Sequence, residues 1–257
     1  MKYIRFQGND GPRWGVVEGD RVRPLERPPY EALSYTGETL PLGACKLLEP
    51  VEPTKIVCVG KNYYDHAVEM GEGIPKTPIL FLKGPNVLNA PGAAITAPDH
   101  VTRVDYEGEL GVVIRRRAKA VKAAEAMDYV LGYTCFNDVT ARIIQKSDGQ
   151  WTRGKSMDGF GPCGPWITDE VDPADLAVTT RLNGAVVQQS RTGLLMRDVA
   201  HLIEFITASM TLEPGDLIAT GTPAGIGPMY DGDRVEVEIE GIGILGNPVV
   251  LPHIPRE

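Results

Sequence analysis

The sequence has few cysteines, few histidines and no long apolar run. Its four cysteines are too widely spaced for a zinc knuckle or a paired redox motif, lying at Cys45, Cys58, Cys135 and Cys163. We therefore expect reduced thiols and a cytoplasmic location. No window holds the roughly 18 apolar residues of a membrane span, and the N-terminus lacks the apolar core of a secretory signal. We expect no membrane partner.

Acidic residues outnumber basic ones, which gives a formal net charge of −8 and a pI near 5.1. This balance argues against nucleic acid or an anionic membrane surface as a partner. An anionic substrate would need cationic side chains inside its site, because the overall field does not attract it. With 257 residues and 42% hydrophobic content, the chain can bury a full core in one large or two unequal domains.

The first fifty residues predict a small β-meander. Three short strand patterns, separated by glycine-rich turns, lie at residues 3–6, 13–18 and 21–25. A proline-rich connector follows and ends at a boundary near 51–54. We therefore divide the chain into an N-terminal β subdomain with its connector at 1–52 and a larger domain at 53–257.

The larger domain has many strand patterns and few helical ones. Apolar or alternating runs predict strands at 55–59, 78–83, 103–114, 130–136, 217–220, 234–240 and 242–245. The dipeptide Asn183-Gly184, between 179–182 and 185–188, is typical of a type I′ hairpin. Helical spacing indicates an amphipathic helix over 194–206 and shorter helices at 66–70, 122–128 and 139–146. These elements predict a mostly β, α+β fold.

The strand at 103–114 carries two acids. Residues two apart on a strand share a face, so Glu107 and Glu109 point the same way, roughly 6–7 Å apart. The opposite face is apolar and suits a core, with Leu110, Val112 and Ile114. The acids are typical of the solvent-facing edge of a half-buried strand. The alternative is half of a hard-metal site, because such close carboxylates repel unless a cation lies between them.

Asp138 is a second source of a carboxylate. It precedes the helix predicted at 139–146 and shares one face of that helix with Arg142 and Gln145. One interpretation is a helix cap with an ion pair to Arg142. The other places an acid, a cation and an amide along one wall of a pocket. Adjacency to Glu107 and Glu109 would decide between them.

His66 and Glu69 stand three residues apart on a short predicted helix and therefore face the same way. A carboxylate beside a histidine orients the ring and raises its basicity, which a general base needs. A surface His–Glu pair is the common alternative. Gly71 and Gly73 would let this segment move as a lid.

Two further features have open roles. The loop 220–227 is glycine-rich but lacks the Gly-Lys-Ser/Thr of a phosphate-binding P-loop, so it is either a plain turn or an anion-binding nest. Lys155 lies among glycine and aromatic residues, and we expect it to be solvated, as most lysines are.

The motifs, in this order, resemble those of the fumarylacetoacetate hydrolase family. The matching segments are Val59–Tyr63, His66-x-x-Glu69, Phe81–Lys83, Asp105–Leu110, Asp138–Gln145, Lys155-Ser156, Gly164–Trp166 and Thr220–Gly225. One motif alone is weak, but the ordered set is highly specific. The chain is especially similar to bacterial 2-hydroxyhepta-2,4-diene-1,7-dioate and 5-carboxymethyl-2-hydroxymuconate isomerases. It departs from the family at Lys61, where arginine is frequent, and at Ile143, where aspartate is frequent.

The resemblance implies a mixed β-sandwich roll, a homodimer and one divalent cation per subunit, Mg²⁺ or Mn²⁺. The implied metal ligands are Glu107, Glu109 and Asp138. The implied catalytic residues are Lys155 and a His66–Glu69 pair on a lid. Implied substrate contacts come from Arg142, Gln145 and Thr222, with Lys155 as a further contact.

The function implied is chemistry on a small anionic 2-oxo acid, in which the metal stabilises an enolate and His66 moves a proton or activates water. We rank C–C bond hydrolysis of an acylpyruvate or fumarylpyruvate first. Isomerisation of a 2-hydroxy-dienoic acid and oxaloacetate-type decarboxylation, within aromatic catabolism, are the alternatives. A non-catalytic scaffold of the same fold would be expected to lose the His66–Glu69 pair, which this chain keeps.

Overall fold

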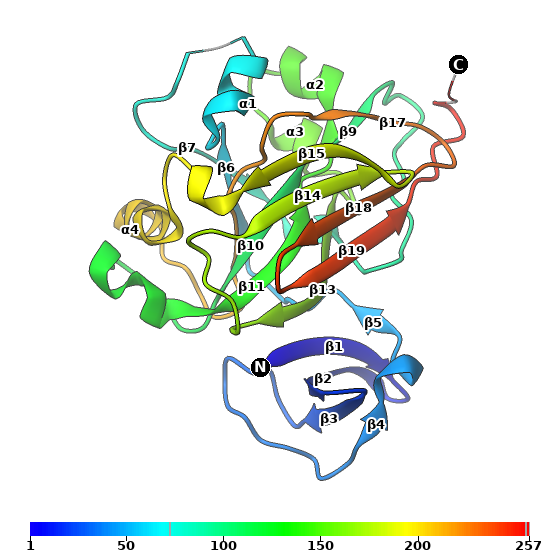
Figure 1. Cartoon of the computed structure of the whole chain (residues 1–257), viewed down its shortest axis with the longest axis vertical. Coiled ribbons are helices and arrows are strands. Elements are labelled where there is room, and N and C mark those ends of the chain that lie inside the picture. The colour runs from blue at the N-terminus through cyan, green and yellow to red at the C-terminus, as the bar shows by residue number, and fades with distance from the viewer. Residues whose placement is uncertain (72, 255, 257) are drawn as a thin grey trace.

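The structure is a computed structural model that describes residues 1–71, 73–254 and 256 (Figure 1). Strands dominate it and form a twelve-stranded, a four-stranded and a three-stranded sheet. The helices are few and short, and they lie at the edges of these sheets. The predicted mostly β, α+β fold is confirmed.

The N-terminal strands form the predicted meander at one end of the molecule (Figure 1). They are β1 (Lys2–Gly8), β2 (Gly11–Glu18), β3 (Arg21–Leu25), β4 (Leu40–Pro41) and β5 (Leu47–Leu48). Strand β1 also pairs antiparallel with β13 (Gly161–Thr168), so the meander extends the largest sheet. The division into 1–52 and 53–257 remains a proposal.

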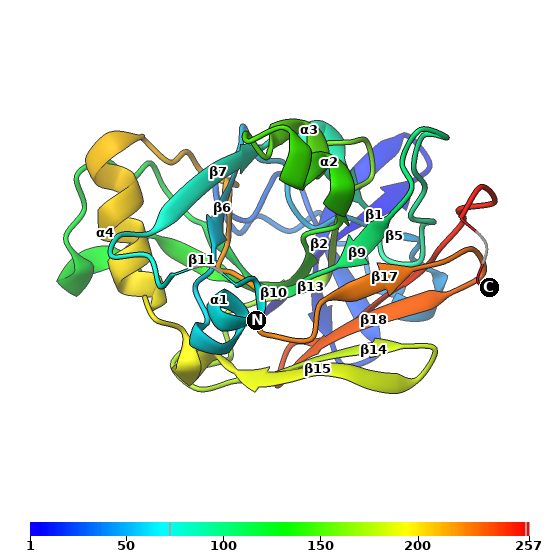
Figure 2. The same ribbon diagram turned by 90° about the horizontal axis from the view of Figure 1, so that it is seen from above.

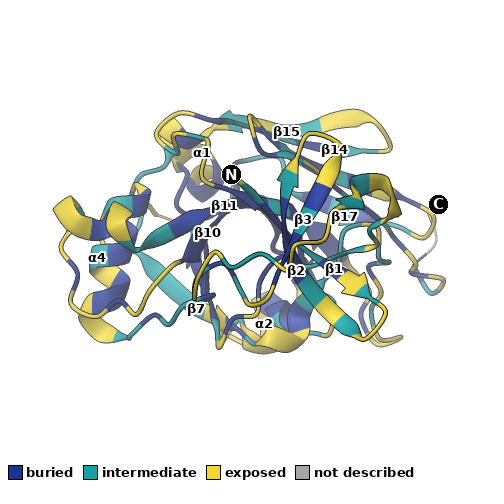
Figure 3. Cartoon of the chain, turned by 90° about the horizontal axis from the view of Figure 1, so that it is seen from below, coloured by how far each residue is buried: buried dark blue, intermediate teal, exposed yellow. Residues whose placement is uncertain are grey.

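The rest of the largest sheet runs in the order β13, β11, β10, β16, β6, β7. The bounds are β6 (Ile56–Gly60), β7 (Ile79–Lys83), β10 (Gly108–Ile114), β11 (Val130–Asn137) and β16 (Leu217–Ala219), with β8 (Leu88–Asn89) beside β13. The strands predicted in these regions are confirmed. Figure 3 shows β10 and β11 in the colour of buried residues, as expected for strands covered on both faces.

A four-stranded sheet covers one face of β10 and β11 (Figure 2). Its strands are β14 (Ala177–Leu182), β15 (Ala185–Arg191), β18 (Arg234–Ile239) and β19 (Gly243–Pro248). Asn183 and Gly184 have φ angles of 53° and 82°, as a type I′ turn needs, so the predicted hairpin is confirmed. The core between the two sheets contains Leu110, Val112, Ile114, Val178 and Val237.

The predicted strand at 103–114 is interrupted at Glu107. Strand β9 (Val104–Tyr106) pairs with β12 (Thr140–Ala141) and β17 (Gly227–Met229) in the smallest sheet, and β10 begins only at Gly108. Glu107 therefore lies at the junction of two sheets. Position 108 needs glycine, because a Cβ atom there would lie 2.2 Å from Thr180 Oγ1 in the covering sheet.

The short predicted helices are present with shifted bounds. Helical turns occur at α1 (Tyr64–Glu69) and as the 3₁₀ helix η3 (Ala123–Tyr129). The helix predicted at 139–146 begins later, as α2 (Arg142–Ser147), because residues 140–141 are drawn into pairing with β9. Helix α3 (Thr152–Lys155) follows directly. Single 3₁₀ turns lie at η1 (Leu42–Ala44), η2 (Pro85–Val87) and η4 (Thr192–Leu194).

The amphipathic helix is shorter than predicted. It is α4 (Val199–Ser209), and Leu194 and Leu195 lie before it. The backbone N–H of His201 donates to the Asp198 carboxylate over 2.9 Å, which caps the helix. Within the residues described, no helix is long and apolar enough to span a bilayer.

Candidate active site

A cavity of about 210 Å³ lies where α1, α2 and α3 approach the ends of β6 and β10. It brings together side chains that are far apart in the sequence. Of the predicted site residues, those lining it are His66, Glu107, Glu109, Asp138, Arg142, Gln145, Lys155 and Thr222. Lys61, where the chain departs from the family, lines it as well. Glu69 stands behind His66 and contacts it.

The three acids predicted as metal ligands are buried side by side. Glu107, Glu109 and Asp138 are each at most 4% exposed, and one carboxylate oxygen of each lies within 4.8 Å of the others. The antiparallel pairing of Gly108 with Asn137 produces this, and the Asp138 N–H donates to the Glu107 carbonyl over 2.9 Å. The solvent-facing interpretation of Glu107 and Glu109 is therefore wrong.

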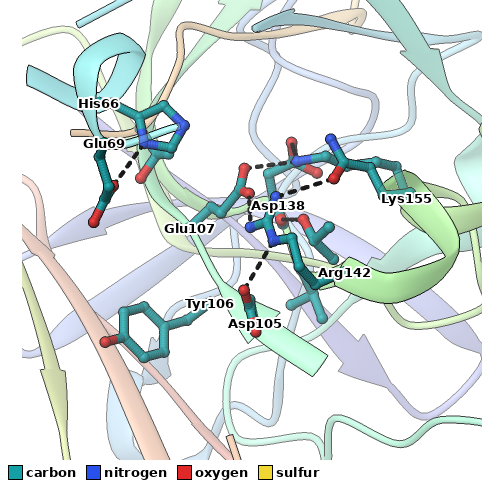
Figure 4. A network of polar contacts seen from close by, with 12 residues as sticks. His66, Glu69, Asp105, Tyr106, Glu107, Asp138, Arg142 and Lys155 are labelled. Carbon is teal, nitrogen blue, oxygen red and sulfur yellow. Dashed lines mark hydrogen bonds and ion pairs between the residues drawn. The ribbon is translucent and has the colours of Figure 1, made fainter. Parts of the chain in front are cut away.

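Asp138 is not a helix cap. Ala141 is the residue before α2, and no side chain caps that helix. Instead, the two carboxylate oxygens of Asp138 accept from two buried ammonium groups. One is Lys83 Nζ. The other is Lys155 Nζ, at 2.7 Å (Figure 4). The expectation that Lys155 is solvated is also wrong, since it is 3% exposed and donates to Glu107 Oε2 over 2.6 Å.

Arg142 does not pair with Asp138, so that predicted ion pair is wrong. Its Nε donates to Asp105 Oδ2 over 2.8 Å, and its Nη2 donates to Glu107 Oε1. Its Nη1 lies 3.3 Å from Gln145 Oε1. Asp138, Arg142 and Gln145 nevertheless line the same cavity, as the pocket-wall interpretation requires.

Sequence reasoning gave no role to Lys83 or Asp105, which are buried charges next to the three acids. Lys83 is 1% exposed and donates to Asp138 and to the Phe160 carbonyl, the latter at 2.7 Å. Asp105 is fully buried and holds the guanidinium groups of Arg103 and Arg142. For Lys83 the available signal was a charge at the end of an apolar strand. For Asp105 it was only that the residue lies within a segment matched to the family.

The electrostatics differ sharply between neighbouring carboxylates. Burial raises the pKa of Glu107, but the charges of Lys155 and Arg142 outweigh this and hold that pKa well below its ordinary value. For Glu109, burial and the charges of Asp138 and Glu107 raise the pKa well above its ordinary value. Burial lowers the pKa of Lys155, but Asp138 and Glu107 raise it overall. The Lys155 side chain therefore stays protonated and positively charged.

Glu109 marks the place that fits a divalent cation. Its carboxylate accepts the Gly221 N–H over 2.8 Å, and among the described residues no ion pair joins it to a cation. A buried carboxylate that faces two other acids without a cation is costly. Carboxylate oxygens from three residues suit Mg²⁺ or Mn²⁺ better than zinc. The side chains present therefore fit a hard divalent cation.

The His66–Glu69 pair is built into the cavity. His66 is 6% exposed, and its Nδ1 lies 3.0 Å from Glu69 Oε2. Figure 4 shows the opposite edge of the ring turned toward Glu107. Because a carboxylate accepts at Nδ1, that nitrogen carries the proton in the neutral ring and Nε2 keeps its lone pair. The surface-pair interpretation is wrong for His66, whereas Glu69 is about one-third exposed.

The loop 220–227 is not a plain turn. Its Gly221 N–H donates to Glu109, and its Gly225 N–H donates to Glu69 Oε1 over 3.0 Å. The backbone thus binds anions, as a nest does, but they are carboxylates of the protein itself. Thr222 faces the cavity, and its hydroxyl donates to the Gly108 carbonyl over 3.0 Å.

Known protein families and solved structures resemble this chain over most of its length. The family model of the fumarylacetoacetate (FAA) hydrolase C-terminal domain matches residues 55–250, and a model described as Rv2993c-like, N-terminal, matches residues 1–50. A 2-hydroxyhepta-2,4-diene-1,7-dioate isomerase from Mycobacterium marinum is 47% identical, with a TM-score of 0.91 over 98% of both chains.

Two further relatives are similar to this chain over nearly its whole length. A 5-carboxymethyl-2-hydroxymuconate delta-isomerase from Mycobacterium smegmatis is 43% identical, with a TM-score of 0.92 over 98% of this chain and 100% of that one. The mitochondrial oxaloacetate tautomerase fahd2 of Xenopus laevis is 40% identical over 97% of this chain and 90% of its own length. With a family match across most of its length, the chain belongs to the fumarylacetoacetate hydrolase family.

Proposed function

We propose that the protein is a divalent-metal-dependent enzyme that enolises a small 2-oxo acid, moving a proton at the carbon next to the keto group. Keto–enol tautomerisation and double-bond isomerisation both need this step. The observation that carries the proposal is the His66–Glu69 pair facing three clustered acids across one small cavity. The names of the isomerase and tautomerase relatives support the same class of reaction.

Glu107, Glu109 and Asp138 would hold the cation, Mg²⁺ or Mn²⁺. When bound, it would supply positive charge beside the substrate's carboxylate and 2-oxo oxygens as C3 loses a proton. Arg142 and Lys155 offset the negative charge of the acids, which an anionic substrate requires in a chain of net charge −8. Gln145 and Thr222 line the same cavity and would contact the substrate's polar atoms.

His66 would move the proton. Glu69 fixes the ring through Nδ1, so Nε2 is free to accept a proton from C3 on one side of the cavity. The same atom can return that proton to oxygen or to a more distant carbon. The position of the double bond in the substrate then decides between a tautomer and an isomer.

The cavity favours a short substrate. Its volume is about 210 Å³. Phe81 and Trp151 close one side, with ring centroids 5.2 Å apart, and Trp151 packs on Gly60, where a Cβ atom would lie 2.5 Å from the indole. A four-carbon 2-oxo diacid such as oxaloacetate is therefore the first substrate to test.

C–C bond hydrolysis, which gives the family its name, is the second candidate. The same His66 could take a proton from water instead of carbon, and water could then attack a C4 carbonyl of an acylpyruvate. The product would leave as a pyruvate enolate, so the residues assigned above keep their places. Oxaloacetate decarboxylation would also form a pyruvate enolate, which the proposed cation, Arg142 and Lys155 would stabilise.

The experiment that tests the proposal follows C3 deuterium exchange by NMR for oxaloacetate and acetylpyruvate in D₂O with Mg²⁺ or Mn²⁺. We expect metal-dependent exchange or tautomer interconversion above the rate in buffer, without cleavage of acetylpyruvate. Release of acetate and pyruvate would favour the hydrolase instead. Absence of both reactions with every metal would contradict an enolising enzyme.

We also propose a homodimer, as the family resemblance implies. Sedimentation velocity across a range of protein concentrations tests this. A species of twice the 27.9 kDa chain mass is expected. A single 27.9 kDa species throughout would contradict it.

A further inference from the structure

We propose that Tyr106 and Gly225 form a positioning strap, a chain of hydrogen bonds that ends on Glu69. The strap would hold the His66–Glu69 pair in a fixed position relative to the three clustered acids. The inference rests on the proposed role of His66 as the base. Neither residue would touch the substrate. They would act through Glu69, which is exposed enough to need an external support.

The strap is a continuous line of hydrogen bonds. Glu69 uses one oxygen for His66, and its other oxygen accepts the Gly225 N–H over 3.0 Å. On the other side of the same residue, the Gly225 carbonyl accepts from the Tyr106 hydroxyl over 3.0 Å. Tyr106 precedes Glu107 directly, and Figure 4 shows its ring directed toward the side of the site where Glu69 lies. One end of the line is thus the proposed base, and the other is the last residue of β9, next to the proposed metal ligand Glu107.

Position 225 requires glycine, because both its backbone conformation and its close neighbours exclude a larger residue. Its φ is +97°, in the region that favours glycine. A Cβ atom there would also lie 2.2 Å from the Val187 carbonyl oxygen. Close packing on β15 therefore fixes the direction in which the Gly225 N–H points.

The loop that carries Gly225 is itself fastened to β10. The Thr220 and Thr222 hydroxyls donate to the carbonyls of Leu110 and Gly108, each over 3.0 Å. The buried Gln188 amide donates to Thr222 Oγ1 and accepts from the Gly108 N–H, at 2.8 and 3.0 Å. The loop therefore moves with the strand that bears Glu109.

Helix α1 alone would hold Glu69 weakly. It has six residues and no side-chain cap, and such a short helix gains little stability from its own hydrogen bonds. The last residue of that helix is Glu69, whose side chain is 33% exposed. A glutamate in this setting has several accessible rotamers, and the Gly225 N–H selects the one that reaches His66.

The test is Tyr106→Phe, which removes the hydroxyl and keeps the buried ring in its apolar cluster. We expect kcat for C3 proton exchange to fall roughly two- to tenfold, the value of one hydrogen bond, with KM unchanged. In a Glu69→Ala background, Tyr106→Phe should cause no further loss, because its path runs through Glu69. Tyr133→Phe is the matched control, because Tyr133 is also a buried tyrosine but lies on β11. This variant should leave kcat unchanged.

Two measurements that do not use turnover complete the design. Hydrogen–deuterium exchange of residues 64–70 should speed up in Tyr106→Phe but not in Tyr133→Phe, and Mn²⁺ affinity should stay the same in both. Weaker Mn²⁺ binding, or additive losses of kcat with Glu69→Ala, would overturn the strap. If the wild type turns over no 2-oxo acid while the exchange difference is present, the proposed function fails and the strap stands.

Discussion

The two walls of the candidate site are built in different ways. The acid wall comprises three acids and the basic side chains paired with them, which are Glu107, Glu109, Asp138, Lys83, Arg142 and Lys155. These residues come from the ends of buried strands and from the short helices beside them. The lid wall comprises His66 and Glu69, and it belongs to one six-residue helix. The acid wall is part of the core, so its loss affects folding as well as chemistry. Because the lid wall belongs to a short helix outside the sheets, we expect its loss to leave the fold intact.

The largest effect is expected from Asp138→Asn in the acid wall. This change leaves Lys83 without its carboxylate and removes the charge of a proposed metal ligand, so turnover should be abolished and unfolding free energy should fall by about 3–5 kcal/mol. Urea unfolding and Mn²⁺ titration measure both effects. Asp148→Asn, which breaks an exposed pair with Arg153, should change neither. Metal-dependent turnover in Asp138→Asn would remove this residue from the site.

His66→Asn should impair catalysis without the loss of metal binding and stability expected for the acid wall. We expect kcat to fall roughly 10²- to 10⁴-fold, because a general base is lost, while Mn²⁺ affinity and unfolding free energy stay near the wild type. His201→Asn is a matched control, because His201 also pairs with an acid three residues away, Asp198, but on the exposed surface of α4. A His66 variant that is as active as the wild type would remove the lid wall from the mechanism.

Metal removal should distinguish the walls by stability alone. A ligand at a hundred times its Kd stabilises the folded state by about 2.7 kcal/mol, so chelation should lower unfolding free energy by that order. The His66→Asn protein should show the same loss, and Asp138→Asn should show none. Equal responses in both variants would mean that the cation binds elsewhere.

Local sequence patterns were sufficient for most strands and for the hairpin. The turn at Asn183-Gly184 is confirmed because both residues tolerate positive φ, a property of the residues themselves. The alternation around Leu110 and Val112 correctly separated the two faces of β10. What it could not show is that the opposite face, with Glu109, is also covered.

The late start of α2 and the misread charges depend on contacts between distant segments. Thr140 was predicted inside a helix but pairs with Asp105, thirty-five positions earlier in the chain, so nonlocal pairing overrides helical spacing. Lys83 and Lys155 look like ordinary lysines until Asp138 is placed between them. Neither burial nor an ion-pair partner is encoded in the local pattern of a charged residue.

The smallest effect is expected from the aromatic side of the cavity, which joins the two walls. Trp151 comes just before the helix that carries Lys155, and its ring lies over Gly60 at the start of the segment that leads to His66. Trp151→Ala should enlarge the cavity. The kcat/KM for a longer substrate, the 2-hydroxy-dienoic acid 5-carboxymethyl-2-hydroxymuconate, should rise roughly tenfold relative to that for oxaloacetate. Trp151→Phe, which keeps an aromatic ring beside Phe81, should shift this ratio less. Equal losses for both substrates would mean that Trp151 supports Lys155 rather than limiting substrate length, and the aromatic side would then belong to the acid wall.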